Sequence, residues 1–499
     1  MLGQVRQDSY TQRPVQLISP TRLVLCTPVL VLLLWCHSGY AATINAASCS
    51  STDVQTALNA TSSGDTVAIP AGTCTWTTTV TPPCHSWTLQ GSGTGSTNIT
   101  VNNSSGDAIS VNGCSGGSIR VTGISFNTSA VGSGGVIFIF GGSGLSFRID
   151  HNTFQSSTSW GRWLWDNVPC VSPGCVIDHN TITNQGALIA AETPGDTDNL
   201  AGIAMWSKPM VIDNGSEVYF ENNSFTFNNY FANDMMDCDN GGRYVFRYNT
   251  VVGNVVFDHG YDSVAESCLE LTAYQNNLNG AYNGTNEAQA DILYRGGTGV
   301  VYQNIMKNST QANFLVTNYR SNGSGSDIIA SNLPYCGGGN SKDGNVTNGW
   351  PCYEQIGRGS SPTTPGQASY PLYEWDNCKT ALGCTGTSDQ NTITAYNNIG
   401  GTPDYTVADI VKNRDFYDSQ STGCTGTQST GVCIGLLSAR AGNCTAGVAY
   451  WATDSNTLYK CSSTNTWAVY YQPYTYPHPL QGASSAAPAP PVNVTTTVN

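Results

Sequence analysis

Two six-residue phrases, Ile149-Asp-His-Asn-Thr-Phe154 and Ile177-Asp-His-Asn-Thr-Ile182, are nearly identical and start 28 residues apart. Further copies follow at Phe220-Glu-Asn-Asn-Ser-Phe225, Phe246-Arg-Tyr-Asn-Thr-Val251, Ala273-Tyr-Gln-Asn-Asn-Leu278 and Val301-Tyr-Gln-Asn-Ile-Met306, with weaker copies at 329–334 and 394–399. The aligned residues are Asn152, Asn180, Asn223, Asn249, Asn276, Asn304 and Asn332, at steps of 28, 43, 26, 27, 28 and 28. Such near-constant spacing predicts stacked coils, in which each coil buries an apolar face on its neighbours.

Each copy has an apolar residue three positions before the Asn and another two positions after it. This pattern predicts a short strand, a corner at the Asn, and a second strand. Stacked strands lie about 4.8 Å apart, so the Asn side chains of successive corners are expected to bond to one another as a ladder. One step upstream, the stretch 121–126 fits the same frame with Ile124 in place of the Asn.

These repeats resemble the pectin lyase-like superfamily of right-handed parallel β-helix proteins, whose repeats are of the PbH1 type. The resemblance covers about residues 43–404 and includes Asp53-Val-Gln-Thr-Ala-Leu58 followed by Gly64-Asp-Thr-Val-Ala-Ile-Pro-Ala-Gly72. It implies an all-β fold, a right-handed parallel β-helix (solenoid) in which this stretch forms an N-terminal capping helix and the first strand. The fold carries lyases, hydrolases, esterases and adhesins, so it does not assign a function.

The composition agrees with stacked coils, because apolar columns and uncharged corners need few charges. Only 10% of the 499 residues are charged, against roughly 25% in an ordinary globular protein. There are 19 Lys and Arg against 33 Asp and Glu, which gives a net charge of −14. Without a basic patch the chain is not expected to bind nucleic acid.

Residues 1–41 have the features of a cleaved signal peptide: Arg6, Arg13 and Arg22 precede an apolar run at 23–35, and a small-residue cleavage pattern follows. Removing this segment leaves 16 basic and 32 acidic residues. We therefore expect a secreted, extracellular protein that has no membrane association in its mature form and is a monomer.

Sixteen cysteines remain after the signal peptide, and an even number in an exported chain indicates disulfides. Pairing nearest neighbours gives Cys49–Cys74, Cys84–Cys114, Cys170–Cys175, Cys238–Cys268, Cys336–Cys352, Cys378–Cys384, Cys424–Cys433 and Cys444–Cys461. Spacing alone does not fix this connectivity, so it is a hypothesis.

The repeat also suggests the domain limits. Residues 42–404 are expected to form the β-helix, with an insertion loop at about 333–390 where the repeat lapses. Residues 405–482 hold four cysteines and many aromatic residues, which favours a disulfide-rich C-terminal segment that caps the solenoid. Residues 483–499 are rich in Pro and Thr and form a linker or tail.

Two charged columns are expected to point outward. The column six residues before the Asn contains Glu217, Arg243 and Glu270; the column two residues before it contains Asp150, Asp178, Glu221, Arg247, Tyr274 and Tyr302. One interpretation is an exposed salt-bridge ladder, which contributes little per pair. The other is a groove in which Glu217 and Glu270 bind a sugar.

Loops on one side of these coils carry more candidate site residues. They hold Trp160, Trp163, Trp165, Trp206, Asp234, Asp237, Asp239, Arg243, His259 and Asp262. The pairing Cys238–Cys268 would place the aspartate loop beside the histidine loop. Asp and Asn in such loops also serve as turn formers, and the Trp residues can form a packed loop core.

In the functional interpretation, the four Trp residues are platforms for sugar rings. Asp234, Asp237 and Asp239 provide the hard oxygen ligands that Ca²⁺ prefers. His259 or Arg243 acts as the base, Asp262 orients His259, and Arg247 belongs to the same polar site.

These residues predict a polysaccharide partner and a polysaccharide lyase-like activity, β-elimination on a uronate-containing polysaccharide. Two alternatives stay open: a glycoside hydrolase, which needs two carboxyl groups, and a non-catalytic extracellular adhesin or glycan-binding protein. The Arg-x-Pro-x-x-Arg element of one pectate lyase family is absent, as are the Asn-Thr-Asp and Gly-His-Gly elements of polygalacturonases. No family catalytic set is therefore transferred to this chain.

Overall fold

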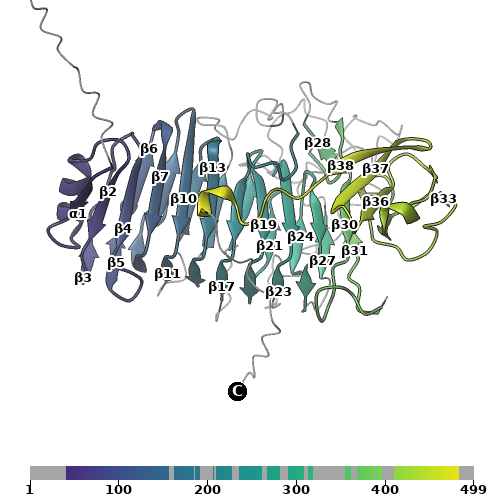
Figure 1. The fold of residues 1–499 in the computed structure, drawn as a ribbon. Helices are drawn as coiled ribbons and strands as arrows, with labels where there is room; N and C mark the ends of the chain where they lie inside the picture. The colour runs from purple at the N-terminus through teal and green to yellow at the C-terminus, as the bar shows by residue number, and fades with distance from the viewer. Residues whose placement is uncertain are drawn as a thin grey trace, which may run out of the picture. The chain divides into compact units, whose positions relative to one another are not determined.

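The structure, a computed structural model, is nearly all β, with few helical residues (Figure 1). It describes residues 41–156, 162–184, 186–190, 206, 210–227, 235–260, 267–280, 290–307, 313–317, 354–360, 368–386, 388–395 and 410–482. Within these ranges most strands belong to three long parallel sheets, called here sheets A, B and C.

Sheet A has twelve strands: β1 (Thr43–Asn45), β2 (Asp65–Ile69), β4 (Trp87–Gly91), β7 (Ser115–Thr122), β10 (Gly144–Asp150), β13 (Cys170–Asp178), β16 (Val218–Glu221), β19 (Arg243–Arg247), β22 (Glu270–Tyr274), β25 (Val300–Tyr302), β30 (Leu372–Trp375) and β32 (Phe416–Tyr417). Sheet B has nine: β3 (Gly72–Trp76), β5 (Thr97–Asn103), β8 (Ser125–Val131), β11 (Thr153–Ser156), β14 (Thr181–Thr183), β17 (Ser224–Thr226), β20 (Thr250–Val252), β23 (Asn277–Asn279) and β26 (Ile305–Met306). Sheet C also has nine: β6 (Ile109–Asn112), β9 (Ile137–Phe140), β12 (Arg162–Asn167), β15 (Gly186–Ala190), β18 (Asp237–Asp239), β21 (Val256–Asp258), β24 (Ile292–Tyr294), β27 (Phe314–Val316) and β31 (Ile393–Ala395).

From β4 to β27 the chain visits the three sheets in rotation, one strand in each before it returns to the first. The parallel register therefore places equivalent repeat residues on adjacent strands. Ile149 pairs with Val121 and with Ile177, and Phe154 pairs with Phe126 and Ile182. These side chains are buried in a single core between the sheets, which confirms the predicted stacking of the repeats.

The corner between sheets A and B carries the predicted asparagine ladder. Both the backbone N–H and Nδ2 of Asn152 donate to Oδ1 of Asn180, at 3.0 and 3.2 Å. The same pair of bonds recurs from each rung to the next as far as Asn304. Ile124, which replaces the Asn one step upstream, donates its N–H to Asn152 Oδ1 as expected.

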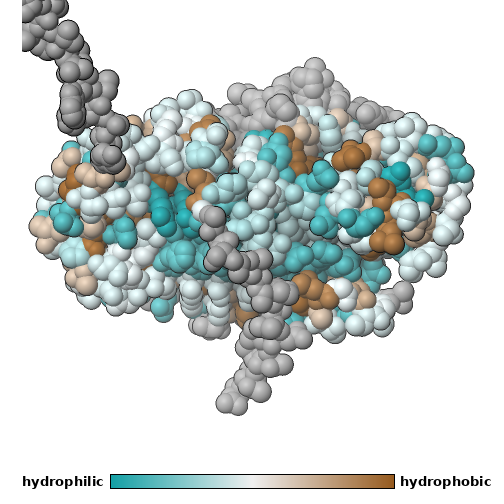
Figure 2. All heavy atoms as spheres, in the orientation of Figure 1, coloured by the Kyte–Doolittle hydropathy of each residue, from teal (hydrophilic) through white to brown (hydrophobic). Residues whose placement is uncertain are grey.

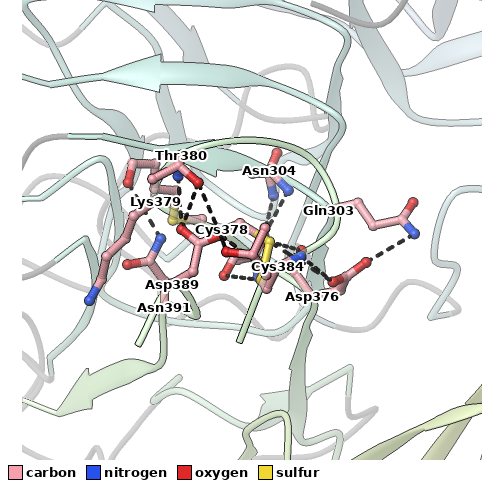
Figure 3. The surroundings of a disulfide bond; sticks show 12 residues. Gln303, Asn304, Asp376, Cys378, Lys379, Thr380, Cys384, Asp389 and Asn391 are labelled. Carbon is pink, nitrogen blue, oxygen red and sulfur yellow. Dashed lines mark hydrogen bonds between the residues drawn. A yellow bond between two sulfur atoms is a disulfide. The ribbon is translucent and has the colours of Figure 1, made fainter. Parts of the chain in front are cut away.

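The ladder continues from Asn304 to Asn377, not to Asn332 as the repeat predicted. Asn304 donates to Asn377 Oδ1 at 3.0 and 2.8 Å, while Asn332 lies outside the described residues. The predicted insertion at 333–390 therefore contains a strand of sheet A, β30, which pairs with β25. Figure 3 shows the Cys378–Cys384 disulfide beside this rung, with Gln303 pointing toward Asp376.

A helix, α1 (Ser51–Asn59), lies in the stretch where the resemblance implied one. The Ser50 side chain accepts a hydrogen bond from the Asp53 N–H and so caps the first turn. Val54 and Leu58 bury one face of the helix in the core.

The C-terminal segment adds small elements of its own. A four-stranded sheet consists of β34 (Val432–Gly435), β36 (Ala449–Ala452), β37 (Thr457–Ser463) and β38 (Thr466–Tyr471). Shorter elements of this segment are β33 (Thr427–Gln428), β35 (Asn443–Cys444), and the 3-10 helices η2 (Leu437–Ala439) and η3 (Pro479–Gln481). The antiparallel pair β28 (Arg358–Gly359) and β29 (Ala368–Ser369) lies instead within the predicted insertion.

Residues 470–481, called here the C-terminal strap, run back along the outward face of sheet A from β38 toward β13, as the yellow trace in Figure 1 shows. Tyr476 donates its hydroxyl to Asn222 Oδ1 at 2.7 Å, and the Leu480 carbonyl accepts from Arg148 at 3.1 Å. The strap therefore lies over the face of sheet A, a position that the expectation of an end cap did not include.

Seven of the eight predicted disulfides are present, and Cys336–Cys352 lies outside the described residues. This number of disulfides fits an oxidising, extracellular compartment. In the described part of the chain, no helix has the length and apolarity needed to cross a membrane. Figure 2 shows mainly hydrophilic and neutral residues on the side over which the strap runs, with hydrophobic side chains in small separate patches.

Candidate functional site

The structure divides the predicted site between two sheets. Glu217, Arg243, Arg247 and Glu270 belong to the outward face of sheet A, whereas Trp165, Asp237, Asp239 and His259 belong to sheet C. Trp160, Asp234 and Asp262 lie outside the described residues. The single cluster that the sequence suggested is thus two separate groups of side chains.

The charged face of sheet A is buried, so the prediction of an exposed ladder or open groove was wrong. Arg247 is fully buried, and its guanidinium donates to Glu221 and, at 2.8 Å each, to the carbonyl oxygens of Tyr474 and Thr475. The strap supplies both carbonyls and excludes solvent from the face. Arg247 therefore has a structural role and does not reach a substrate.

Glu217 and Glu270 flank Arg243 on adjacent coils, as the repeat predicted, because Arg243 pairs with Glu270 and β16 precedes β19 in the sheet. Both glutamates are fully buried. Burial raises the pKa of Glu217 and that of Glu270, while the charge of Arg243 lowers both. Their predicted role as substrate-binding residues is wrong, since no sugar can reach them.

Asp213 joins the strap to this buried network. Its carboxylate accepts hydrogen bonds from the hydroxyl groups of Tyr219, Tyr274 and Tyr471, at 2.9, 3.0 and 2.8 Å. It also accepts the N–H of Tyr474 at 3.1 Å. Both oxygens of Asp213 thus accept hydrogen bonds, which is the condition under which a buried charge is tolerated.

Of the three predicted Trp platforms that the structure describes, only Trp165 faces outward. Trp163 is fully buried in the core against Phe154, with ring centroids 5.1 Å apart. Trp206 is 1% exposed, and its indole N–H donates to the Ser267 carbonyl at 3.1 Å. Trp163 and Trp206 are therefore packing residues, and their assignment as platforms was wrong.

Trp165 is half-buried and belongs to an aromatic row on the outward face of sheet C. Phe138 on the adjacent strand β9 meets its ring edge-on at 5.3 Å, and Phe140 stacks on Phe138 at 5.3 Å. The Arg162 guanidinium lies 4.7 Å from the Trp165 ring centroid. The sequence analysis missed both Phe residues, although the alternation Ile137-Phe-Ile-Phe140 predicts a strand with both rings on one face.

Asp237 and Asp239 lie on the same outward face, because Cys238 between them points into the core and forms the disulfide with Cys268. Asp237 is half-buried and Asp239 is 5% exposed. Burial lowers the pKa of Arg162, and the charges of these two aspartates oppose that effect. The acids and Arg162 therefore interact across this face of sheet C.

His259 and Arg295 continue the row of Asp239 onto the next two coils. Cys238 pairs with Asp258, and the His259 N–H extends that ladder by donating to the Cys238 carbonyl at 2.8 Å. Strand β21 pairs with β24 in the same way, which brings Arg295 next to His259, although the Arg295 side chain is fully buried. An acid, an imidazole and a guanidinium thus follow one another at the interstrand spacing of about 4.8 Å.

The side chains beneath this row help to hold it in place. Nδ1 of His259 lies 2.6 Å from the Gly260 carbonyl, which assigns that nitrogen as the donor and Nε2 as the basic nitrogen. Asp258 is fully buried and accepts the N–H groups of Arg295 and Gly296 at 3.4 and 3.2 Å. Burial raises the pKa of Asp258 well above its usual value.

The outward face of sheet C therefore carries Phe138, Phe140, Arg162, Trp165, Asp237, Asp239 and His259, and it is called here the sheet C face. An aromatic row on β9 and β12 can stack on sugar rings, and the paired acids and the base, two and three strands away from β12, can transfer protons. Ligating groups close enough to share a metal ion occur elsewhere in the described chain and do not include Asp237 with Asp239. The chain matches no protein-family model, no curated protein and no solved structure.

Proposed function

We propose that this chain is a secreted right-handed parallel β-helix protein that binds a polysaccharide along the sheet C face and cleaves it there. The observation that carries the proposal is the pair Asp237 and Asp239, two carboxylates on one face of one strand beside an aromatic row. The predicted signal peptide and the seven disulfides support export to an oxidising compartment.

Hydrolysis of a glycosidic bond is the reaction that the two acids favour. Asp237 and Asp239 lie two residues apart on one face of β18, and glycoside hydrolysis needs two carboxyl groups that flank the bond. Asp237, the more exposed of the two, would act as the general base. Asp239 is the more buried of the two and serves as the general acid.

The aromatic row binds the substrate. Trp165, Phe138 and Phe140 offer ring faces and edges on which the C–H groups of a sugar pack. Arg162 is positioned over Trp165 and donates to sugar hydroxyl or carboxylate oxygens.

A second candidate reaction, β-elimination on a uronate, is favoured by His259, whose Nε2 is the basic ring nitrogen. His259 would take the proton next to the uronate carboxylate. In this reaction Ca²⁺ held by Asp237 and Asp239 would neutralise that carboxylate. Arg243 and Arg247, which the sequence suggested for this chemistry, belong to sheet A and take no part in it.

The test is a panel of neutral and uronate-containing polysaccharides, assayed for new reducing ends and for the ultraviolet absorbance of unsaturated uronate. Hydrolysis gives reducing ends without absorbance, and Asp237→Asn and Asp239→Asn each lower the rate by about 10²- to 10⁴-fold. Gln155→Asn, an exposed change on sheet B, is the matched control and leaves the rate unchanged.

The other outcomes decide between the alternatives. Reducing ends with absorbance, lost in His259→Asn, would replace hydrolysis by β-elimination. Binding of a polysaccharide without either product would leave a non-catalytic glycan-binding protein. Cleavage that survives both Asp variants and the His259 variant would remove the site from the sheet C face.

A further inference from the structure

Two histidines stack on each other at the corner between sheets A and B, away from the strands of the sheet C face. His151 and His179 occupy the same position on successive coils, one residue before the ladder Asn, with φ angles of 54° and 55°. Their rings are 4.9 Å apart between centroids and nearly parallel, at 4°. The repeat therefore presents two imidazoles side by side at the surface.

Each imidazole is held by a buried carboxylate. His151 Nδ1 lies 2.8 Å from Asp150 Oδ2, and His179 Nδ1 lies 2.8 Å from Asp178 Oδ2. Because an ionised carboxylate only accepts, Nδ1 carries the proton in both rings and Nε2 carries the lone pair. A carboxylate bound to the far ring nitrogen is the arrangement that orients metal-binding histidines and raises their basicity.

The carboxylates are themselves fixed. Asp150 and Asp178 are fully buried. Arg120 donates twice to Asp150, at 2.7 and 2.6 Å, and Arg148 donates twice to Asp178, at 2.8 Å each. The side chains of His151 and His179 are in contrast 56% and 40% exposed. A rigid charged layer thus supports two accessible rings.

We propose that His151 and His179 together bind one divalent transition-metal ion, such as Zn²⁺ or Cu²⁺, through their Nε2 atoms. Ligand atoms of these two residues and Asp178 lie within 4.8 Å of one another. Imidazole nitrogen is a preferred ligand of both ions. At a Zn–N distance of about 2.0–2.1 Å the two Nε2 atoms must come within about 4.1 Å of each other. Because an imidazole binds a metal in its ring plane, the exposed rings must turn toward each other out of the stacked arrangement when the ion binds. Water completes the coordination.

The chain offers a well-matched substitution for each ligand. The same left-handed position on the next coil is occupied by Asn222, with φ of 58°. Asn tolerates this conformation, so His151→Asn and His179→Asn keep the corner intact while removing the imidazole. His85, whose Nε2 lies 2.9 Å from Thr61 Oγ1, provides the control His85→Asn.

The experiment is calorimetric titration of Zn²⁺ into protein purified without a histidine tag, repeated with Cu²⁺ and read by electron paramagnetic resonance. We expect one ion per chain, nitrogen hyperfine splitting from two imidazoles, and at least about 10-fold weaker binding in either Asn variant. The ion should also raise the melting temperature of the wild type and of His85→Asn, because it binds only the folded chain.

Absence of binding to the wild type overturns the proposal. So does equal binding by the double variant, since the ion would then occupy other ligands. The readouts do not involve polysaccharide cleavage, so the metal site and the sheet C face stand or fall separately.

Discussion

The outward faces of sheets A and C both carry charged residues in register, yet they differ in what lies over them. On sheet A the strap covers the charges, and Arg247, Glu217, Glu221 and Glu270 are fully buried. On sheet C the corresponding outward side chains Trp165, Asp237 and His259 are half-buried. Charge in a column of stacked strands therefore does not by itself predict an accessible face. What lies over the face decides its exposure.

The covered face has the energetics of a protein interior. A buried ion pair whose desolvation is compensated by hydrogen bonds contributes little net stability, but removal of one partner leaves an uncompensated charge. Arg247 neutralises Glu221 and lies 3.8 Å from Asp213. On the half-buried face, by contrast, removing one partner of an ion pair lowers stability little, because water solvates the charge that remains.

The largest effect is expected from Arg247→Met. It leaves two buried carboxylates without their cation, and we expect the free energy of unfolding to fall by about 3–5 kcal/mol. Urea unfolding measures the loss. The matched control is Arg120→Met on the same sheet, because Arg120 is 39% exposed and Asp150 keeps Arg148 as a partner; a loss of about 1 kcal/mol or less is expected there. Equal losses in the two variants would contradict the contrast between the covered and uncovered parts of sheet A.

A smaller effect is expected from acid through His478 of the strap. Burial, followed by the nearby charge of Arg247, lowers the pKa of His478 to about 4. The unfolded imidazole binds its proton near pH 6.5, so the unfolded chain holds more protons between about pH 6.5 and 4 and stability falls as pH drops through that window, by at most about 3 kcal/mol.

The comparison of wild type with His478→Gln isolates this contribution. Burial raises the pKa of Glu221, which therefore titrates in the opposite direction and cancels in the difference. Urea unfolding at several pH values between 7 and 4 should show a steeper loss in the wild type. Identical slopes would mean that the strap does not bury His478 in solution.

The ladder and the register were predictable because they depend on local spacing. Asn152 bonds to Asn180, which lies one repeat away, and each later rung repeats that bond. The burial of sheet A was not predictable, since the carbonyl that covers Arg247 belongs to Tyr474, 227 residues later. No periodicity relates residues so far apart in different parts of the fold.

The sequence predicted the site residues of sheet C incompletely, for two reasons. The register of β12 shifts between Arg162 and Trp165, so that Trp163 and Leu164 both enter the core and simple alternation assigns Trp163 to the wrong side. Arg295 lies next to His259 in the sheet, but the two residues are 36 positions apart in the chain, which is more than the regular repeat of 28. They also lie at different distances from the repeat Asn that follows each of them, so the repeat does not align them. Asp237 and Asp239 were predicted because they are oxygen ligands in a loop that the Cys238–Cys268 pairing places beside the His259 loop.

The smallest effect is expected from Trp165→Ala on the sheet C face. Trp165 is half-buried and contacts Phe138 and Arg162, so its removal should cost the fold little and weaken polysaccharide binding by about 0.5–1.5 kcal/mol, a two- to tenfold rise in the dissociation constant. Trp163→Ala empties a core position and should lower the free energy of unfolding by about 3–5 kcal/mol. We expect this loss of stability to exceed any effect of the variant on binding. The pair separates a residue that faces the ligand from one that supports the sheet. If both variants lost stability equally and neither lost affinity, the sheet C face would be a structural surface like that of sheet A.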